Sequence, residues 1–326
     1  MNLSLGIVGL HNVGKSTLFN ALTKQSVPAE NYPFCTIDPN VGVVAVDDPR
    51  LQAISKIANP EKITPAIIEF VDIAGLVKGA SSGEGLGNKF LSHIKQVSAI
   101  VHVVRGYKNE NVTHVENSIN PKRDIELINT ELILKDLETI DNRIKALQSK
   151  ARFDTKLSTL IETFKHLSEF LEAGNLAQDY IAEGEIDIDL FNKEKKELFL
   201  LTDKPVIYLA NIDEKSESEA LDIIRSFVGN KAVIAMDVKL ESELASMDSK
   251  DRQEFMKELN LEETGLQKLT REAYSLLGLI SFFTEGKEEV RAWTIEKGSK
   301  APAAGAAIHT DFEKGFVAAE VVKYSD

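Results

Sequence analysis

Cysteine is almost absent from this chain of 326 residues, in which Cys35 stands alone. A single cysteine cannot close a disulfide within the chain, which excludes the small secreted domains that depend on such bonds. Long apolar runs are missing too, and no stretch reaches the roughly 18 residues of a membrane-spanning helix. The first residues show no basic cluster followed by an apolar run, so we expect no secretory signal. These features favour a cytoplasmic globular protein that does not bind membranes.

Basic residues are also in short supply, because 38 Lys and Arg face 51 Asp and Glu and leave a formal net charge of −13. A chain this acidic is not expected to coat nucleic acid over its whole surface, although a local basic patch could still bind phosphates. Hydrophobic residues make up 43% and charged residues 27% of the chain, which is ordinary for a globular protein. At about 150 residues per domain, the length predicts about two domains.

Short apolar runs, several of them rich in β-branched residues, predict the strands of an α/β fold. The runs cover residues 3–8, 41–46, 67–71, 100–104, 206–210 and 233–236. Patterns of helical spacing, such as the one over residues 16–22, lie between several of them. Strands that alternate with helices predict βαβ units and a mostly parallel sheet flanked by helices.

Two long helical patterns interrupt this alternation between residues 104 and 206, where no strand is predicted. Apolar residues recur at helical spacing over residues 124–147 and over residues 157–171, and Gly174 and Asn175 form a stop signal. We interpret the two patterns as an αα-hairpin inserted between strands, with its bend near residues 149–154.

Basic residues gather around the predicted bend of this hairpin, against a single acidic residue, Asp154. They are Arg143, Lys145, Lys150, Arg152 and Lys156. A patch of this kind binds phosphates. A solvated hairpin tip without any partner explains the composition equally well.

The sequence pattern changes in the C-terminal residues 278–326. Residues 290–294 and 316–322 predict strands, whereas residues 298–307 are rich in Gly, Ala, Lys and Pro and are expected to form a loop. The segment is short for an independent domain, and we expect a small β-containing module that is incomplete.

Residues 9–16, Gly-Leu-His-Asn-Val-Gly-Lys-Ser, fit the phosphate-binding pattern G-x-x-x-x-G-K-[ST]. The pattern follows a predicted strand and precedes a predicted helix, which is the context that it requires. Backbone N–H groups of the loop and of the helix N-terminus can bind an anion there. Lys15 can reach the terminal phosphates, and the Ser16 hydroxyl can bind Mg²⁺. A chance match is the alternative to a nucleotide site.

A second motif, D-x-x-G, follows the strand predicted over residues 67–71, with Asp72 and Gly75 as its fixed positions. The aspartate can hold Mg²⁺ through water, and the glycine N–H can reach a γ-phosphate. Thr36, between the two motifs, is a natural second Mg²⁺ ligand unless it is an ordinary loop hydroxyl. Five glycines lie between residues 75 and 87. They indicate either a mobile switch loop or a plain flexible connection.

The guanine-recognition motif N-K-x-D, which GTPases of this class carry after a late strand, is altered here. Residues 211–214 read Asn-Ile-Asp-Glu, so Ile212 replaces the lysine and Glu214 replaces the aspartate. Adenine has no 2-amino group, and a carboxylate at this place would gain nothing from it. The change favours ATP or weak base discrimination, and a tolerant GTP site is the alternative.

The glutamine that orients the attacking water in many GTPases is missing as well. Leu76 stands in its place and cannot orient water. Either hydrolysis is slow or another side chain supplies this role. His114 is the candidate, although it can equally be a surface histidine; His93, His102 and Arg105 are alternatives. His102 lies within a predicted strand, where core packing is expected.

Together these residues resemble the YchF family of Obg-related P-loop NTPases over nearly the full chain. The matching segments are residues 6–20, 31–42, 70–87, 120–137, 211–214, 291–294 and 308–316. The resemblance implies an ATP-preferring NTPase that binds ribosomes and is linked to translation and the response to oxidative stress. It also implies three parts: a nucleotide-binding domain (1–120 and 201–277), a coiled-coil arm (121–200) and a TGS module (278–326).

The resemblance also assigns residues to the nucleotide site. The phosphates would be held by Asn12, Val13, Gly14, Lys15, Ser16 and Thr17. Ser16 and Thr36 would bind Mg²⁺, and Asn211 with Ile212 would bind adenine. The remaining nucleotide-binding residues would be Phe34, Asp72, Gly75 and Glu214, and His114 would act in catalysis.

Two departures from the family pattern stand out. The family normally continues some tens of residues beyond a position like Asp326, so we expect the last TGS strands to be absent. Residues 236–239 also differ from the family's usual segment on the far side of the base pocket.

Three functions are compatible with these features. The first is a slow, Mg²⁺-dependent ATPase switch that contacts ribosomal RNA through the arm tip and the TGS module. The second is a GTPase with relaxed base specificity. The third is a non-catalytic scaffold gated by nucleotide.

Overall fold

The computed structural model describes residues 3–27, 38–73, 86–107, 118–151, 154–183, 187–213 and 217–325. The chain divides into two compact units, which are described separately. The first unit comprises Met1–Leu5, Ser16–Val71 and Asp237–Asp326, and the second comprises Gly6–Lys15 and Asp72–Met236. No helix among the described residues is long and apolar enough to cross a membrane.

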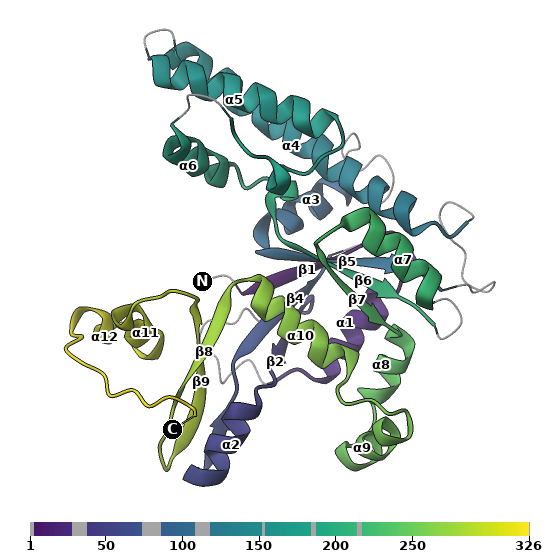
Figure 1. Cartoon of the computed structure of the whole chain (residues 1–326), viewed down its shortest axis with the longest axis vertical. Coiled ribbons are helices and arrows are strands. Elements are labelled where there is room, and N and C mark those ends of the chain that lie inside the picture. The colour runs from purple at the N-terminus through teal and green to yellow at the C-terminus, as the bar shows by residue number, and fades with distance from the viewer. Residues whose placement is uncertain are drawn as a thin grey trace. The chain divides into compact units, whose positions relative to one another are not determined.

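All six strands predicted from apolar runs are present. They are β1 (Ser4–Val8), β2 (Val41–Ala45), β4 (Ile67–Asp72), β5 (Ala99–Arg105), β6 (Val206–Asn211) and β7 (Ala232–Met236). The order in the sheet is β2-β4-β1-β5-β6-β7 (Figure 1). Strand β6 is parallel to β5 and β7, whereas β2 is antiparallel to β4, so the sheet is mixed. Every residue of β1 and β5 is buried, which explains why these strands are mostly apolar in the sequence.

Helices flank the sheet and cover its buried strands. α1 (Lys15–Lys24) follows β1, and α3 (Leu86–Gln96) precedes β5. In the second unit, α7 (Glu217–Val228) packs against β6 and β7 through a cluster that includes Tyr208, Ala220 and Ile224. This arrangement confirms the predicted α/β class.

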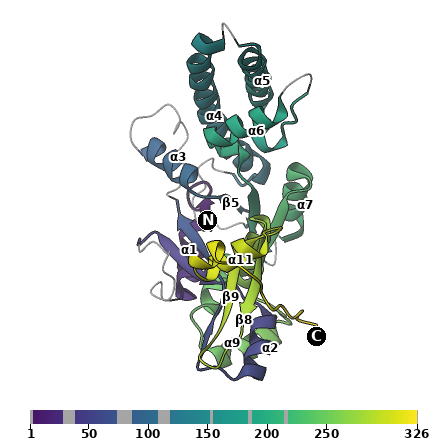
Figure 2. The ribbon, with the colours of Figure 1, turned by 90° about the vertical axis from the view of Figure 1, so that its left-hand side faces the viewer.

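The predicted αα-hairpin is confirmed as the antiparallel pair α4 (Pro121–Ala151) and α5 (Thr155–Glu172), which lie side by side in Figure 2. Their facing apolar residues form one core with those of α6 (Ile188–Leu198), including Ile140, Phe164 and Phe191. Asp154 caps the N-terminus of α5 by accepting hydrogen bonds from the N–H groups of Lys156 and Leu157.

The C-terminal residues form a second, smaller sheet in the first unit, with the order β3-β9-β8. It contains β8 (Leu279–Thr284), β9 (Glu289–Glu296) and the short β3 (Lys62–Thr64), which pairs in parallel with β9. Strand β9 confirms the strand predicted over residues 290–294. Strand β3 lies in the stretch 1–120 that we assigned to the nucleotide-binding domain, and the predicted domain boundaries stay a prediction.

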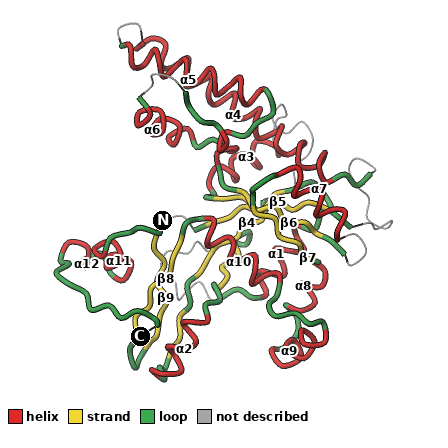
Figure 3. Tube along the Cα trace, in the orientation of Figure 1, coloured by secondary structure: helices red, strands yellow, loops and turns green. Residues whose placement is uncertain are grey.

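Two expectations for the C-terminal segment were wrong. Residues 298–307 were expected to be a loop, but α11 (Ala301–Ile308) occupies most of them, because alanine favours helix and Pro302 is accepted in the first turn. Residues 316–322 were expected to be a strand, but they form an extended loop (Figure 3) in which Val317 is 93% exposed. Alternating apolar residues do not make a strand without a neighbouring strand to pair with. Among the described residues, the last helix is α12 (Asp311–Lys314), which precedes this extended loop.

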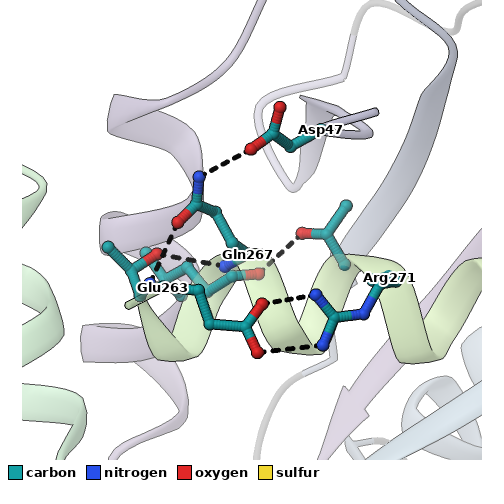
Figure 4. A network of polar contacts seen from close by, with 7 residues as sticks. Asp47, Glu263, Gln267 and Arg271 are labelled. Carbon is teal, nitrogen blue, oxygen red and sulfur yellow. Dashed lines mark hydrogen bonds and ion pairs between the residues drawn. The ribbon is translucent and has the colours of Figure 1, made fainter. Parts of the chain in front are cut away.

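The remaining helices of the first unit are α2 (Pro49–Ala58), α8 (Val238–Leu244), α9 (Ser249–Glu258) and α10 (Gly265–Leu276). A polar network fixes the N-terminus of α10 (Figure 4). Thr264 and Gln267 form a reciprocal capping box, and Gln267 Nε2 also donates to Asp47 at 2.8 Å. Arg271 forms a bidentate ion pair with Glu263. The network ties α10 to the segment between β2 and α2.

Candidate functional site

The loop between β1 and α1 has backbone angles that only a glycine-rich sequence accepts. Gly9 has φ +152° and Gly14 has φ +104°, both in the region that side chains disfavour. A Cβ atom on Gly9 would lie 2.5 Å from the carbonyl oxygen of Val103 in β5. Asn12 also has a positive φ, 61°, which costs energy for a residue with a side chain. The loop is therefore held in a special conformation, as a phosphate-binding loop requires.

Lys15 is the first residue of α1 and directly follows Gly14 of this loop. It is buried, with only 7% of its surface exposed. Its Nζ donates a hydrogen bond to the carbonyl oxygen of Leu10 at 2.6 Å. Burial lowers the pKa of Lys15 to about 8, and the nearby carboxylate of Asp72 opposes this shift. A bound triphosphate would supply the negative charge that this ammonium group needs.

Asp72 ends β4, where the D-x-x-G motif predicts a residue near the phosphates. Burial raises the pKa of Asp72, and the charge of Lys15 opposes the rise. The structure therefore brings the lysine of the first motif and the aspartate of the second into one electrostatic neighbourhood. Asp72 is only half-buried, so its carboxylate remains accessible to a ligand.

Ser16 and Thr17 lie in the first turn of α1, and both side chains are exposed. A hydroxyl at this position and a carboxylate at the end of β4 are oxygen ligands, which Mg²⁺ prefers. No group of three or more His, Cys, Asp or Glu residues that could hold a metal occurs in the part of the chain that the structure describes.

Asn211, at the end of β6, contacts the phosphate-binding loop directly. Its Nδ2 donates to the carbonyl oxygen of Val13 at 2.8 Å, and its side chain is buried. Its own carbonyl oxygen accepts a hydrogen bond from the N–H of Gly106 at 2.8 Å. Ile212 follows with 7% exposure and packs in the cluster that includes Ala220. The structure thus brings Asn211 next to the loop and gives it a loop-bracing role that the motif did not suggest.

Tyr107 also contacts the loop, and Arg105 contacts Tyr107. Arg105 ends β5 and is almost wholly buried; its Nε donates to the carbonyl oxygen of Tyr107, and its guanidinium lies 4.6 Å from the centre of the Tyr107 ring. The Tyr107 hydroxyl donates a long hydrogen bond, 3.5 Å, to the carbonyl oxygen of Asn12. The sequence indicates Arg105 only as an alternative to His114 and does not indicate Tyr107. An arginine that ends a mostly apolar strand was the available signal.

The histidine alternatives differ in their surroundings. His102 is 3% exposed and packs against Tyr208 with ring centres 5.4 Å apart, so the core-packing prediction is confirmed. Burial, helped by the charge of Lys15, lowers the pKa of His102 to about 3 and keeps the ring neutral. His93 is exposed on α3.

Several predicted site residues lie outside the described residues, and their roles stay predictions. They are Phe34, Thr36, Gly75, Leu76, His114 and Glu214.

Comparison with known proteins places this geometry in a family. Residues 4–137 match the family model of the 50S ribosome-binding GTPase, and residues 279–326 match the C-terminal YchF model, described as a protein of unknown function. The ribosome-binding ATPase YchF of Bacillus subtilis is 48% identical over 334 residues, covering 100% of this chain and 90% of that protein. The same-named protein of Escherichia coli O157:H7 is 47% identical with the same coverage.

The three-dimensional comparison agrees. The structure of the Schizosaccharomyces pombe YchF GTPase matches with a TM-score of 0.83 at 38% identity, covering 97% of this chain and 86% of that one. The described phosphate-binding loop, the mixed sheet and the inserted helical hairpin all occur in a chain that matches its relatives almost end to end. This protein therefore belongs to the YchF family.

Proposed function

We propose that this protein is a slow, Mg²⁺-dependent ATPase that switches with its nucleotide and binds ribosomes in the cytoplasm. The YchF relatives from B. subtilis and E. coli, whose names state ribosome-binding ATPase, support the activity and the partner. The observation that carries the choice of ATP is the end of β6. There Asn211 braces the phosphate-binding loop, and buried Ile212 stands where guanine-specific proteins have a lysine.

In this proposal each site residue has a stated task. The phosphates are bound by Asn12, Val13, Gly14, Lys15, Ser16 and Thr17, with Asp72 and Gly75 near the γ-phosphate. Mg²⁺ is held by Ser16 and Thr36, and it would neutralise charge that develops on the phosphates. The adenosine is bound by Ile212, Glu214 and Phe34, and Asn211 supports the site by holding the phosphate-binding loop. The buried ammonium of Lys15 supports its task, because burial disfavours its positive charge and a bound phosphate would stabilise it.

Hydrolysis requires a group that orients water, and we assign this role to His114 because Leu76 replaces the usual glutamine. His114→Ala should lower the turnover number about 100-fold and leave ATP affinity within a factor of about two, since general acid–base groups contribute about that much. His93→Ala, an exposed histidine on α3, is the matched control and should change neither value. Equal turnover in wild type and His114→Ala would remove His114 from the mechanism.

The ribosome contact is assigned to the arm tip and to the TGS module, residues 278–326. Acidic neighbours pair with three of the five basic residues at the tip, which leaves Lys150 and Arg152 as our candidates for the contact. Arg143 pairs with Glu194, Lys145 with Asp141, and Lys156 with Asp187. Lys150 is exposed, and Arg152 lies outside the described residues. Reversing the charge of Lys150 and Arg152 should weaken ribosome binding and its salt dependence, whereas Lys145→Glu should have a smaller effect.

The deciding experiment is displacement of a fluorescent nucleotide by ATP and by GTP in the presence of Mg²⁺. The proposal expects tighter binding of ATP, and loss of both ligands in Lys15→Ala. Tighter binding of GTP would overturn the proposal and favour a GTPase with relaxed specificity, the activity that the N-terminal family model describes. Tight ATP binding without turnover above background, even with ribosomes, would instead favour a nucleotide-gated scaffold.

A further inference from the structure

Three consecutive residues in the second unit each contact a different helix. They belong to the short segment 201–204, which contains the 3₁₀ turn η3 (Leu201–Asp203) and leads into β6. Thr202 contacts α4, Asp203 contacts α6, and Lys204 contacts the end of α3. We call residues 201–204 the joint.

On the side of the arm, the joint is held by a buried carboxylate. Asp136 of α4 is 1% exposed and accepts hydrogen bonds from the N–H of Leu201 at 2.7 Å and the N–H of Thr202 at 2.8 Å. The Thr202 hydroxyl donates a third, at 2.6 Å, and accepts one from the N–H of Ala177. Lys195 of α6 adds an ion pair with Asp203 and a hydrogen bond to Ala177. A movement of the joint therefore requires that α4 and α6 move with it or that these contacts break.

On the other side, Lys204 holds the C-terminal end of α3. Its Nζ donates to the carbonyl oxygens of Lys95 at 3.2 Å and Val97 at 2.5 Å, where the last turn leaves carbonyls without helical partners. Burial lowers the pKa of Lys204, and the nearby charge of Asp136 opposes this shift. The two side chains that hold the joint thus also act on each other.

The position of α3 in the chain gives these contacts a consequence. α3 is the helix that follows the D-x-x-G motif and its glycine-rich segment, residues 72–87. Segments of this kind change conformation with the γ-phosphate in nucleotide switches. A shift of α3 along its axis would either pull Lys204 with it or break two hydrogen bonds to a partly buried ammonium group, which is costly.

We propose that the joint couples α3 to the arm, with Lys204 and Asp136 as the positioning residues on its two sides. Nucleotide state then reaches α4 and α5 through short polar contacts, which are partly buried at α3 and buried at α4. This inference rests on the proposed function, because it requires that the protein bind a nucleotide. It identifies how the ATP site and the ribosome-binding arm communicate.

The test is hydrogen exchange of backbone amides, read by mass spectrometry on the full chain with and without a non-hydrolysable ATP analogue and Mg²⁺. In the wild type, the analogue should change exchange in both α3 and the arm helices α4 and α5. In Lys204→Met, which keeps the length of the side chain and removes its donors, the arm response should fall about fivefold or more, the usual scale of allosteric coupling. The response of α3 and the affinity for the analogue should stay near wild type.

Further variants separate coupling from damage to the fold. Lys204→Arg keeps the charge and should keep the arm response, whereas Thr202→Val removes one hydroxyl and should weaken it. Lys231→Met is the matched control, because it also removes a lysine ion pair within the second unit, the 2.7 Å contact with Asp179. The double variant of Lys204→Met and Asp136→Asn should lose no more coupling than Lys204→Met alone, since both act on one connection.

A wild-type-like arm response in Lys204→Met and Thr202→Val would overturn the inference. An arm that does not respond in the wild type, although the analogue binds, would overturn it as well and leave the proposed ATPase intact. Absence of analogue binding to the wild type would overturn the proposed function and this inference together.

Discussion

Replacing Asn211 with alanine tests what the end of β6 does for the nucleotide site. The side chain is buried, and its Nδ2 donates to the carbonyl oxygen of Val13 at 2.8 Å. Asn211→Ala removes this donor, so the buried carbonyl oxygen of Val13 loses its hydrogen bond from residue 211. Such a loss costs about 1–3 kcal/mol. At 1.4 kcal/mol per factor of ten, this corresponds to about a 5- to 150-fold change in an equilibrium constant.

The penalty can appear in two measurements, because the loop can either stay strained or relax before the ligand arrives. If the loop of Asn211→Ala keeps its native shape, the lost hydrogen bond lowers the free energy of unfolding. If the loop relaxes, it must be reordered when the ligand binds, and the affinity for nucleotide falls instead. We therefore expect the two losses together to reach at least about 1 kcal/mol. ATP and GTP should lose affinity by the same factor, since the contact concerns the loop that holds the phosphates and does not involve the base.

The assay combines urea unfolding of the nucleotide-free protein with displacement of a fluorescent nucleotide by ATP and by GTP. Asn230→Ala, at an exposed asparagine in the turn after α7, is the control and should change neither value by more than about 0.5 kcal/mol. Two results would refute the reasoning: a combined loss no larger than that of the control, or a loss of ATP affinity with unchanged GTP affinity. The second result would make Asn211 a base contact instead of a brace for the loop.

Three further outcomes are expected. Burial lowers the pKa of Lys15 from 10.5 to about 8, so between these values the folded protein holds fewer protons than the unfolded chain. The stability of the nucleotide-free protein should therefore rise with pH over this range, by up to about 3 kcal/mol, and urea titrations of Lys15→Met should lack that rise. Gly9→Ala, whose Cβ would lie 2.5 Å from the Val103 carbonyl oxygen, should lower the free energy of unfolding by at least about 3 kcal/mol, whereas Gly174→Ala, with open space around it, should cost only about 1 kcal/mol in the same assay. Tyr107→Phe removes a long, exposed hydrogen bond and should change ATP affinity less than threefold in the displacement assay, about 0.5 kcal/mol.

The elements that could be predicted from sequence are those whose signal is local. Strands β1 and β5 are buried along their whole length, so each appears as a mostly apolar run. Helices α4 and α5 bury one face along the hairpin, and their apolar spacing shows it. Strand β3 was missed, because Lys62–Thr64 carries no apolar pattern and becomes a strand only through its pairing with β9. Helix α11 was missed because glycine and proline outweighed the alanines in the interpretation of that segment.

The same division applies to the candidate site. The loop motif identified Lys15, and the altered guanine motif identified Asn211, since both are defined by spacing within a short segment. The contact of Asn211 with Val13 joins residues 198 positions apart, and no short motif records such a contact. The basic tip of the arm is a second case. Its composition leaves a phosphate-binding patch and a solvated tip equally open, and Glu194 and Asp187, which pair with Arg143 and Lys156, lie far along the chain on α6 and at its N-terminus.

The pairing of β3 with β9 also constrains the order in which the two units can fold during translation. The hydrogen bond from Thr64 to Glu289 joins residues 225 positions apart. At 5–20 residues per second, a ribosome needs about 10–45 s to make the intervening chain. Strand β9, the partner of Lys62–Thr64, is made only at the end of that time, after the long continuous segment Asp72–Met236 is complete. The first unit is therefore expected to complete its fold after the second.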